Sequence, residues 1–122
     1  MDSIKCFEEL EVWKTGIALS VQIFELFKNC HNFGFRDQIQ RSVVSIPSNI
    51  AEGFERQTNK EFVQYLFIAK GSCAELRTQL QIAMHTKMIT TEIGQRLINE
   101  TKIVSSQLYN LIQYRKTFIN TQ

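Results

Sequence analysis

The chain has 122 residues, which is enough for one domain with a single hydrophobic core. Hydrophobic residues make up 43% of it and charged residues 21%, with one proline and five glycines, which excludes a disordered chain and a loop-rich all-β fold. The formal net charge is only +2, so no overall electrostatic field argues for binding to DNA or RNA.

The three cysteines predict a reducing, cytoplasmic location rather than a disulfide framework. Cys6, Cys30 and Cys73 lie far apart, without a Cys-x-x-Cys pair or paired histidines nearby. This spacing excludes the usual zinc sites, and we expect neither a metal nor a cofactor. No signal peptide is recognisable, and no segment approaches the roughly 18 uninterrupted apolar residues of a membrane span.

Four stretches show the three-and-four spacing of apolar residues that is typical of amphipathic helices. The predicted helices cover residues of about 8–30, 35–56, 59–87 and 91–115. The short breaks between them favour an antiparallel, up-down-up-down order. The sequence therefore predicts an all-α fold, in which residues 1–122 form a single four-helix-bundle domain.

The first predicted helix has three glutamates near its start, where negative charge is stabilising. Its residues expected to be buried are Leu10, Trp13, Ile17, Val21, Phe24 and Phe27. The run from Asn29 to Gly34 ends the helix, because Asn and Gly tolerate left-handed backbone geometry.

The second predicted helix has Pro47 in the middle of its apolar stripe, which consists of Phe35, Ile39, Val43, Ile46, Ile50 and Phe54. A proline removes one backbone hydrogen bond and crowds the preceding turn, so two short helices or one kinked helix would fit. Because the stripe keeps its phase across Pro47, we favour one helix kinked there. Ser42 and Ser45 would then satisfy freed backbone groups.

The third and fourth predicted helices begin at threonine caps. Thr58 precedes Glu61 in a capping-box pattern, and Thr90 is the expected cap of the last helix. The third helix has a seam suited to bundle packing, made of Phe62, Leu66, Ala69, Cys73, Leu76, Leu80 and Ala83. The fourth is expected to bury Leu97, Thr101, Val104, Leu108 and Leu111. Gly71 interrupts the seam and predicts a close approach between helices.

A polar stripe lies beside the apolar one on the second and third helices. It comprises Gln38, Arg41, Ser45, Asn49, Glu52 and Arg56, and then Ser72, Glu75 and Gln79. If the two helices pair, these rows meet in a hydrogen-bonded layer, in which Arg41 would neutralise Glu52 or Glu75. The competing interpretation is a hydrolytic site that uses both glutamates, but no histidine or aspartate joins them. We favour the structural network.

Other catalytic arrangements fail on their spacing. A di-iron bundle needs Glu-x-x-His motifs, and Ile82 stands three residues before His85. Ser45 and Cys73 have no neighbouring base to activate them, and the glycines form no phosphate-binding loop. We therefore predict no catalytic residue and no enzyme activity.

Basic residues gather in the second half of the chain. From Glu61 onward, seven of them stand against four acidic residues. Such asymmetry can mark a basic face, although the solvated surfaces of helices look similar. The candidates for contact with nucleic acid are Lys70, Arg77, Lys87, Arg96, Lys102, Arg115 and Lys116.

The chain resembles the four-helix-bundle family whose members are also called 23S rRNA intervening-sequence proteins or S23 proteins. The resemblance lies in QIQRSVVSIPSNIAEGFER at Gln38–Arg56, EFVQYLFIAKGSCAEL at Glu61–Leu76 and FEELEVWK at Phe7–Lys14, so it covers nearly the whole chain. Members are often encoded within intervening sequences of bacterial rRNA genes, and no biochemical activity is firmly attached to them. By resemblance, the matching positions hold the bundle or a subunit interface; they are Gln38, Arg41, Ser45, Pro47, Asn49, Glu52, Gly53, Gly71, Ser72 and Glu75.

The family is similar to the accessory variability protein of diversity-generating retroelements, a pentamer that binds reverse transcriptase and nucleic acid. The resemblance thus implies a homopentamer with RNA or a reverse-transcriptase-like protein as its partner. That relative is expected to be markedly basic, whereas this chain carries only +2. The leading interpretation is a non-enzymatic oligomeric scaffold that engages RNA or an RNA-handling partner. The alternatives are a purely structural protein-interaction module and, less favoured, a nuclease that uses Glu52 and Glu75.

Overall fold

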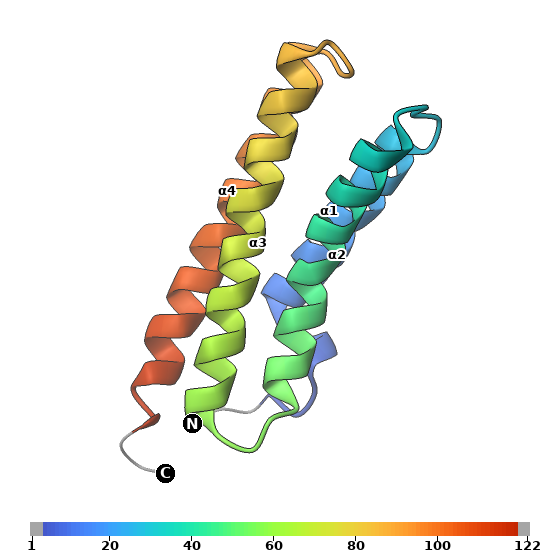
Figure 1. The fold of residues 1–122 in the computed structure, drawn as a ribbon. Coiled ribbons are helices and arrows are strands. Elements are labelled where there is room, and N and C mark those ends of the chain that lie inside the picture. Colours follow the sequence, from blue (N-terminus) through green and yellow to red (C-terminus); the bar gives the residue numbers. More distant parts are fainter. Residues whose placement is uncertain (1–3, 120–122) are drawn as a thin grey trace.

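The computed structural model describes residues 4–119, which form a short 3-10 helix, η1, and four α-helices, with no strand in this range. Their bounds are Phe7–Glu9 for η1, Glu11–Phe27 for α1, Phe33–Phe54 for α2, Asn59–His85 for α3 and Thr91–Lys116 for α4. Figure 1 shows the four long helices packed side by side. The predicted all-α four-helix bundle is confirmed.

Polar side chains cap the helices where the sequence predicts it. Thr58 Oγ1 accepts a hydrogen bond from the backbone N–H of Glu61 at 3.1 Å, and Thr90 Oγ1 accepts one from that of Ile93 at 3.1 Å. Each cap satisfies a backbone donor that the first helical turn leaves unpaired. α1 begins at Glu11, later than predicted, since the residues before it form η1.

The helices are arranged so that α3 contacts both α2 and α4, while α1 packs chiefly on α2. Ser45 of α2 lies beside Ser72 of α3, whereas Gly53, further along α2, lies beside the earlier Tyr65. These two helices therefore run in opposite directions. Figure 1 shows the α1–α2 and α3–α4 connections at one end of the bundle and the α2–α3 connection at the other. Within residues 4–119, no helix is both long and apolar enough to cross a membrane.

The core is formed by the apolar stripes that the sequence predicts on α2, α3 and α4. All seven members of the α3 seam are buried, as are the four central members of the α2 stripe. On α4, four of the five predicted residues are buried and Leu111 is half-buried. Burial of these side chains is the main favourable term that holds the helices together.

The predicted stripe of α1 is correct at its two ends, where Leu10 and Phe27 are buried, and wrong in the middle. Ile17, Val21 and Phe24 are exposed, with Val21 at 63%. The buried residues of α1 are Val12, Gly16, Leu19, Ser20, Ile23 and Phe27, of which only Phe27 belongs to the predicted stripe. Two of these six, Gly16 and Ser20, are small or polar, so a prediction based on large apolar residues chose the adjacent face of the helix. α1 therefore presents an apolar stripe to the surface.

Pro47 lies inside a continuous α2 and packs against α1. A Cβ placed on Gly16 would lie 3.5 Å from the Pro47 ring, so a residue without a side chain allows this close contact. Pro47 has no N–H to donate to the carbonyl of Val43, four residues earlier. Ser20 Oγ of α1 lies 3.3 Å from this carbonyl and shares its one hydrogen between it and the Gly16 carbonyl at 2.8 Å, so the hydroxyl that reaches the freed group comes from α1 rather than from α2. The kink expected at Pro47 stays a prediction.

Two glycines that match the family motif have opposite surroundings. A Cβ on Gly53 would lie 2.5 Å from Tyr65 Cβ and 3.3 Å from the Phe62 carbonyl oxygen, so α2 and α3 can approach closely only because Gly53 has no side chain. A Cβ on Gly71 would have nothing within 4 Å, and Gly71 is exposed. The predicted close approach at Gly71 is therefore wrong for the helices of this chain.

Candidate functional site

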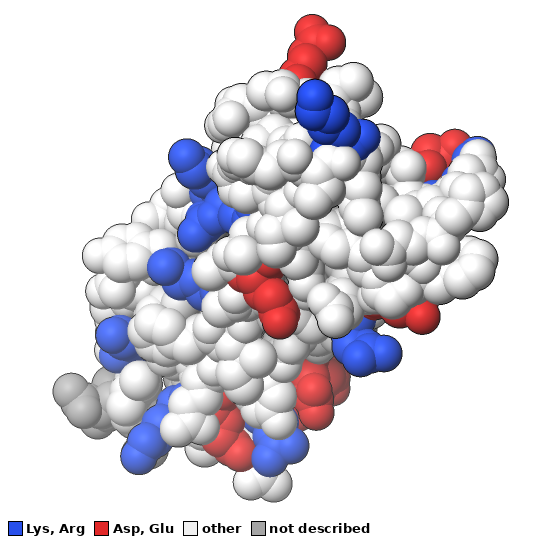
Figure 2. All heavy atoms as spheres, turned by 45° about the horizontal axis from the view of Figure 1, so that its top comes forward, with Lys and Arg blue, Asp and Glu red and all other residues white. Residues whose placement is uncertain are grey.

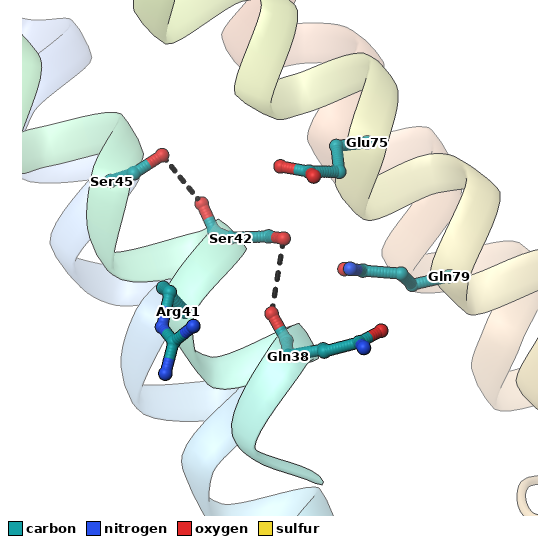
Figure 3. Close-up of a pocket in the computed structure, with 6 residues that line it drawn as sticks. All are labelled: Gln38, Arg41, Ser42, Ser45, Glu75 and Gln79. Atoms are coloured by element: carbon teal, nitrogen blue, oxygen red, sulfur yellow. Dashed lines mark hydrogen bonds between the residues drawn. The ribbon is translucent and has the colours of Figure 1, made fainter. Parts of the chain in front are cut away.

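A polar cleft of about 390 Å³ lies between α2 and α3. Figure 3 shows the side chains that line it, from α2 and from α3: Gln38, Arg41, Ser42, Ser45, Glu75 and Gln79. Five of the six belong to the polar stripe that the sequence predicts, because residues three and four apart share one face of a helix. Ser42 is the addition, and the three-residue step from Ser42 to Ser45 could have shown its place.

Serine hydroxyls form the part of the predicted polar layer that joins the two helices. The hydroxyls of Ser45 and Ser72 hydrogen-bond to each other between α2 and α3. Ser42 Oγ donates to the Gln38 carbonyl at 3.1 Å, and Asn49 Nδ2 donates to the Ser45 carbonyl at 2.7 Å. These bonds satisfy polar groups at a helix contact, which is a structural role.

The charged members of the polar stripe do not pair as expected. Arg41, Glu52 and Glu75 are all exposed. Among the residues that the structure describes, Arg41 forms no ion pair with either glutamate. Figure 3 shows the Arg41 head group turned away from Glu75. The predicted neutralisation of a carboxylate by Arg41 is therefore wrong: both partners keep their hydration, and an exposed pair would gain little by forming.

Glu52 and Glu75 lie at different levels of the bundle. The Ser45–Ser72 contact places Glu75 level with Ser42. Glu52 follows Ser42 by ten residues, or about 15 Å along the helix axis. Two carboxylates that share a catalytic metal ion must both reach it, and this separation prevents that. Within residues 4–119, no three His, Cys, Asp or Glu side chains gather to hold a metal ion.

Four of the seven predicted basic residues form what we call the α3–α4 basic side: Lys70, Arg77, Lys102 and Lys116. Lys70 and Arg77 lie seven residues apart on α3, and Lys102 and Lys116 lie fourteen apart on α4, so each pair shares a helix face. Lys116 Nζ lies 5.3 Å from the centre of the Phe67 ring of α3, which brings the two rows together. Figure 2 shows Lys and Arg side chains following one another down this side.

Two other predicted nucleic-acid contacts are engaged within the bundle. Arg115 is only 8% exposed, donates to Asn59 Oδ1 at 3.3 Å and lies over the Phe62 ring, so its predicted role as a surface contact is wrong. Arg96 is exposed but donates to Gln22 of α1 at 2.7 Å and to Glu100 at 2.9 Å. It thereby joins α1 to α4. The seventh residue, Lys87, is exposed in the α3–α4 connection.

Cys73 provides no nucleophile. Cys73 lies in the core with no exposed surface, and its burial raises the pKa of the thiol to about 11. The thiol therefore stays protonated and unreactive at neutral pH, since only the thiolate is nucleophilic. Cys6 and Cys30 are half-buried free thiols. Cys73 thus acts as a small core residue, as the sequence indicates.

Comparison with known proteins agrees with the four-helix-bundle fold. Residues 8–110 match the model of the family described as 23S rRNA-intervening sequence protein. No curated protein matches the sequence. A crystal structure of a protein of unknown function from the S23 ribosomal protein family of Bacteroides thetaiotaomicron has 27% sequence identity and a TM-score of 0.78, over 84% of this chain and 95% of that one. The chain therefore belongs to the 23S rRNA-intervening sequence protein family.

Proposed function

We propose that this protein is a non-enzymatic, oligomeric four-helix bundle that binds RNA along the α3–α4 basic side. The observation that supports this most is the arrangement of four basic residues: Lys70 and Arg77 share a face of α3, Lys102 and Lys116 share a face of α4, and Lys116 lies over Phe67 of α3. Lysines at such positions bind phosphate oxygens without reading the base sequence. Exposed aromatic residues accompany them, Phe67 on α3 and Tyr109 on α4, and such rings are surfaces on which bases stack.

Fluorescence anisotropy with a labelled single-stranded RNA tests this proposal. At low salt, Lys102→Ala combined with Lys116→Ala is expected to weaken binding about tenfold or more, because two phosphate contacts are lost. The matched control combines Lys14→Ala with Lys28→Ala, which removes the same charge from α1 and from the residue that follows it. Equal weakening in both double variants would show a non-specific charge effect and contradict a binding side on α3 and α4.

The proposal includes a homopentamer, as the family resemblance implies. The exposed apolar stripe of Ile17, Val21 and Phe24 on α1 supports an oligomer, because surfaces of this kind are covered when subunits associate. Light scattering on a size-exclusion column is expected to give a mass of about five times the 14.2 kDa chain. A single-chain mass at micromolar concentration would contradict this part of the proposal.

The second candidate function is a purely structural protein-interaction module, and the same α1 stripe favours it. The partner would then be a protein, such as a reverse-transcriptase-like enzyme, and RNA would not compete with it. A nuclease that uses Glu52 and Glu75 is not retained, because the two carboxylates lie at different levels of the bundle. We propose a cytoplasmic location on the basis of the three free cysteines.

A further inference from the structure

The cleft between α2 and α3 contains a buried acceptor that no group of the described chain satisfies. Gln79 is only 8% exposed, and its Oε1 has no hydrogen-bond partner within residues 4–119. Buried acceptors are almost always paired, because losing water without gaining a donor is costly. A cleft that keeps such an oxygen is ready to receive a donor from outside the protein.

A second acceptor lines the same cleft one helical turn earlier. Glu75 is exposed, and no ion pair among the described residues involves it. Residues four apart lie on the same face of a helix, and Figure 3 shows Glu75 and Gln79 both extending from α3 toward α2. One wall of the cleft therefore offers a carboxylate and an amide oxygen side by side.

The opposite wall does not supply the missing donors. The hydroxyls of Ser42 and Ser45 donate to backbone carbonyls of α2, each at 3.1 Å. The Arg41 guanidinium lies at the edge of the cleft, and Figure 3 shows it turned away from Glu75 and Gln79. The Gln38 amide also lines the cleft, but it forms no side-chain hydrogen bond among the described residues, so it leaves Gln79 Oε1 unpaired as well.

We infer that this cleft binds a small organic cation with a guanidinium group, which donates N–H groups to the Glu75 carboxylate and to Gln79 Oε1. A guanidinium is planar, permanently charged and carries five N–H donors and no acceptor, which complements the Glu75 carboxylate and the unpaired Gln79 oxygen. A volume of about 390 Å³ suits a ligand of the size of an arginine side chain. The site lies apart from the α3–α4 basic side, so this inference can be tested independently of RNA binding.

Isothermal titration calorimetry of the full chain with agmatine, arginine and citrulline tests the ligand class. Agmatine and arginine are expected to bind. Citrulline, in which a neutral urea group replaces the guanidinium, is expected to bind at least about tenfold more weakly. Arginine with blocked amino and carboxyl groups separates the two sources of the guanidinium: tighter binding than agmatine would identify a polypeptide side chain as the source. No binding of agmatine at millimolar concentration, or equal binding of citrulline and arginine, would overturn the inference.

Variants of the two acceptors test the residues. Glu75→Gln and Gln79→Leu are each expected to weaken agmatine binding about tenfold or more. Gln79→Leu should also raise the melting temperature, since it removes the unpaired buried oxygen, and so shows that the variant folds. Glu52→Gln is the matched control, because Glu52 is an exposed glutamate that does not line the cleft. The affinity of this variant for agmatine should change less than about twofold. Loss of binding in Glu52→Gln equal to that in Glu75→Gln would refute the assignment.

Discussion

Replacing Leu66 with alanine is expected to lower the free energy of unfolding by about 2–5 kcal/mol. Leu66 has no exposed surface and belongs to the α3 seam, and α3 contacts both α2 and α4. Truncation removes buried methyl groups and leaves a cavity that long, packed helices cannot close completely. Urea denaturation followed by circular dichroism, at one fixed protein concentration, measures the change.

The matched control for this change is Ile68→Ala, two residues further along α3. Ile68 is 53% exposed, so its truncation is expected to change the free energy of unfolding by less than about 0.5 kcal/mol. A similar loss at both positions would mean that α3 does not present these faces as described. A negligible loss at Leu66 would contradict its place in the core.

Gly53→Ala is expected to destabilise the protein by about 1–3 kcal/mol, whereas Gly71→Ala is expected to stabilise it by about 0.5–1 kcal/mol. Alanine has a higher helix propensity than glycine, so the loss expected at position 53 arises from packing. The new methyl group at position 53 would lie 2.5 Å from Tyr65 Cβ, an atom next to the backbone that moves only with α3 itself. At position 71 it would meet nothing within 4 Å.

The same denaturation experiment on the two glycine variants separates these cases. Each variant is the control for the other, because both replace a helical glycine with alanine: Gly53 lies in the last turn of α2 and Gly71 in the interior of α3. A gain in stability for Gly53→Ala would show that α2 and α3 are further apart than described. A loss for Gly71→Ala would indicate that another subunit packs closely at Gly71, which would support its place in an oligomer interface.

The fold of α2, α3 and α4 could be predicted from the sequence because large apolar residues mark their buried sides without interruption. The capping roles of Thr58 and Thr90 could also be predicted, since a cap depends only on local chain geometry. The residues buried in the middle of α1 could not be predicted from the positions of large apolar residues. Gly16 is buried against Pro47 and Ser20 against the Val43 carbonyl of α2, and such contacts with another helix leave no periodic signal in α1.

The candidate site was predictable in its position but not in its pairings. Ser45 and Ser72 meet because short side chains are placed by the backbone alone. Longer side chains have several rotamers, and tertiary surroundings select among them. Arg115 therefore turns inward over Phe62, and Arg41 turns away from Glu75. From the sequence alone, the two arginines would both be expected on the surface with their charges free to pair.

The salt dependence of RNA binding tests the central claim most directly. The wild-type dissociation constant for a single-stranded RNA would be measured by anisotropy at several potassium chloride concentrations. Binding through the four residues of the α3–α4 basic side predicts that the logarithm of the association constant falls with the logarithm of salt concentration with a slope of about −3. A slope near zero, or no binding at low ionic strength, would contradict RNA binding by this surface.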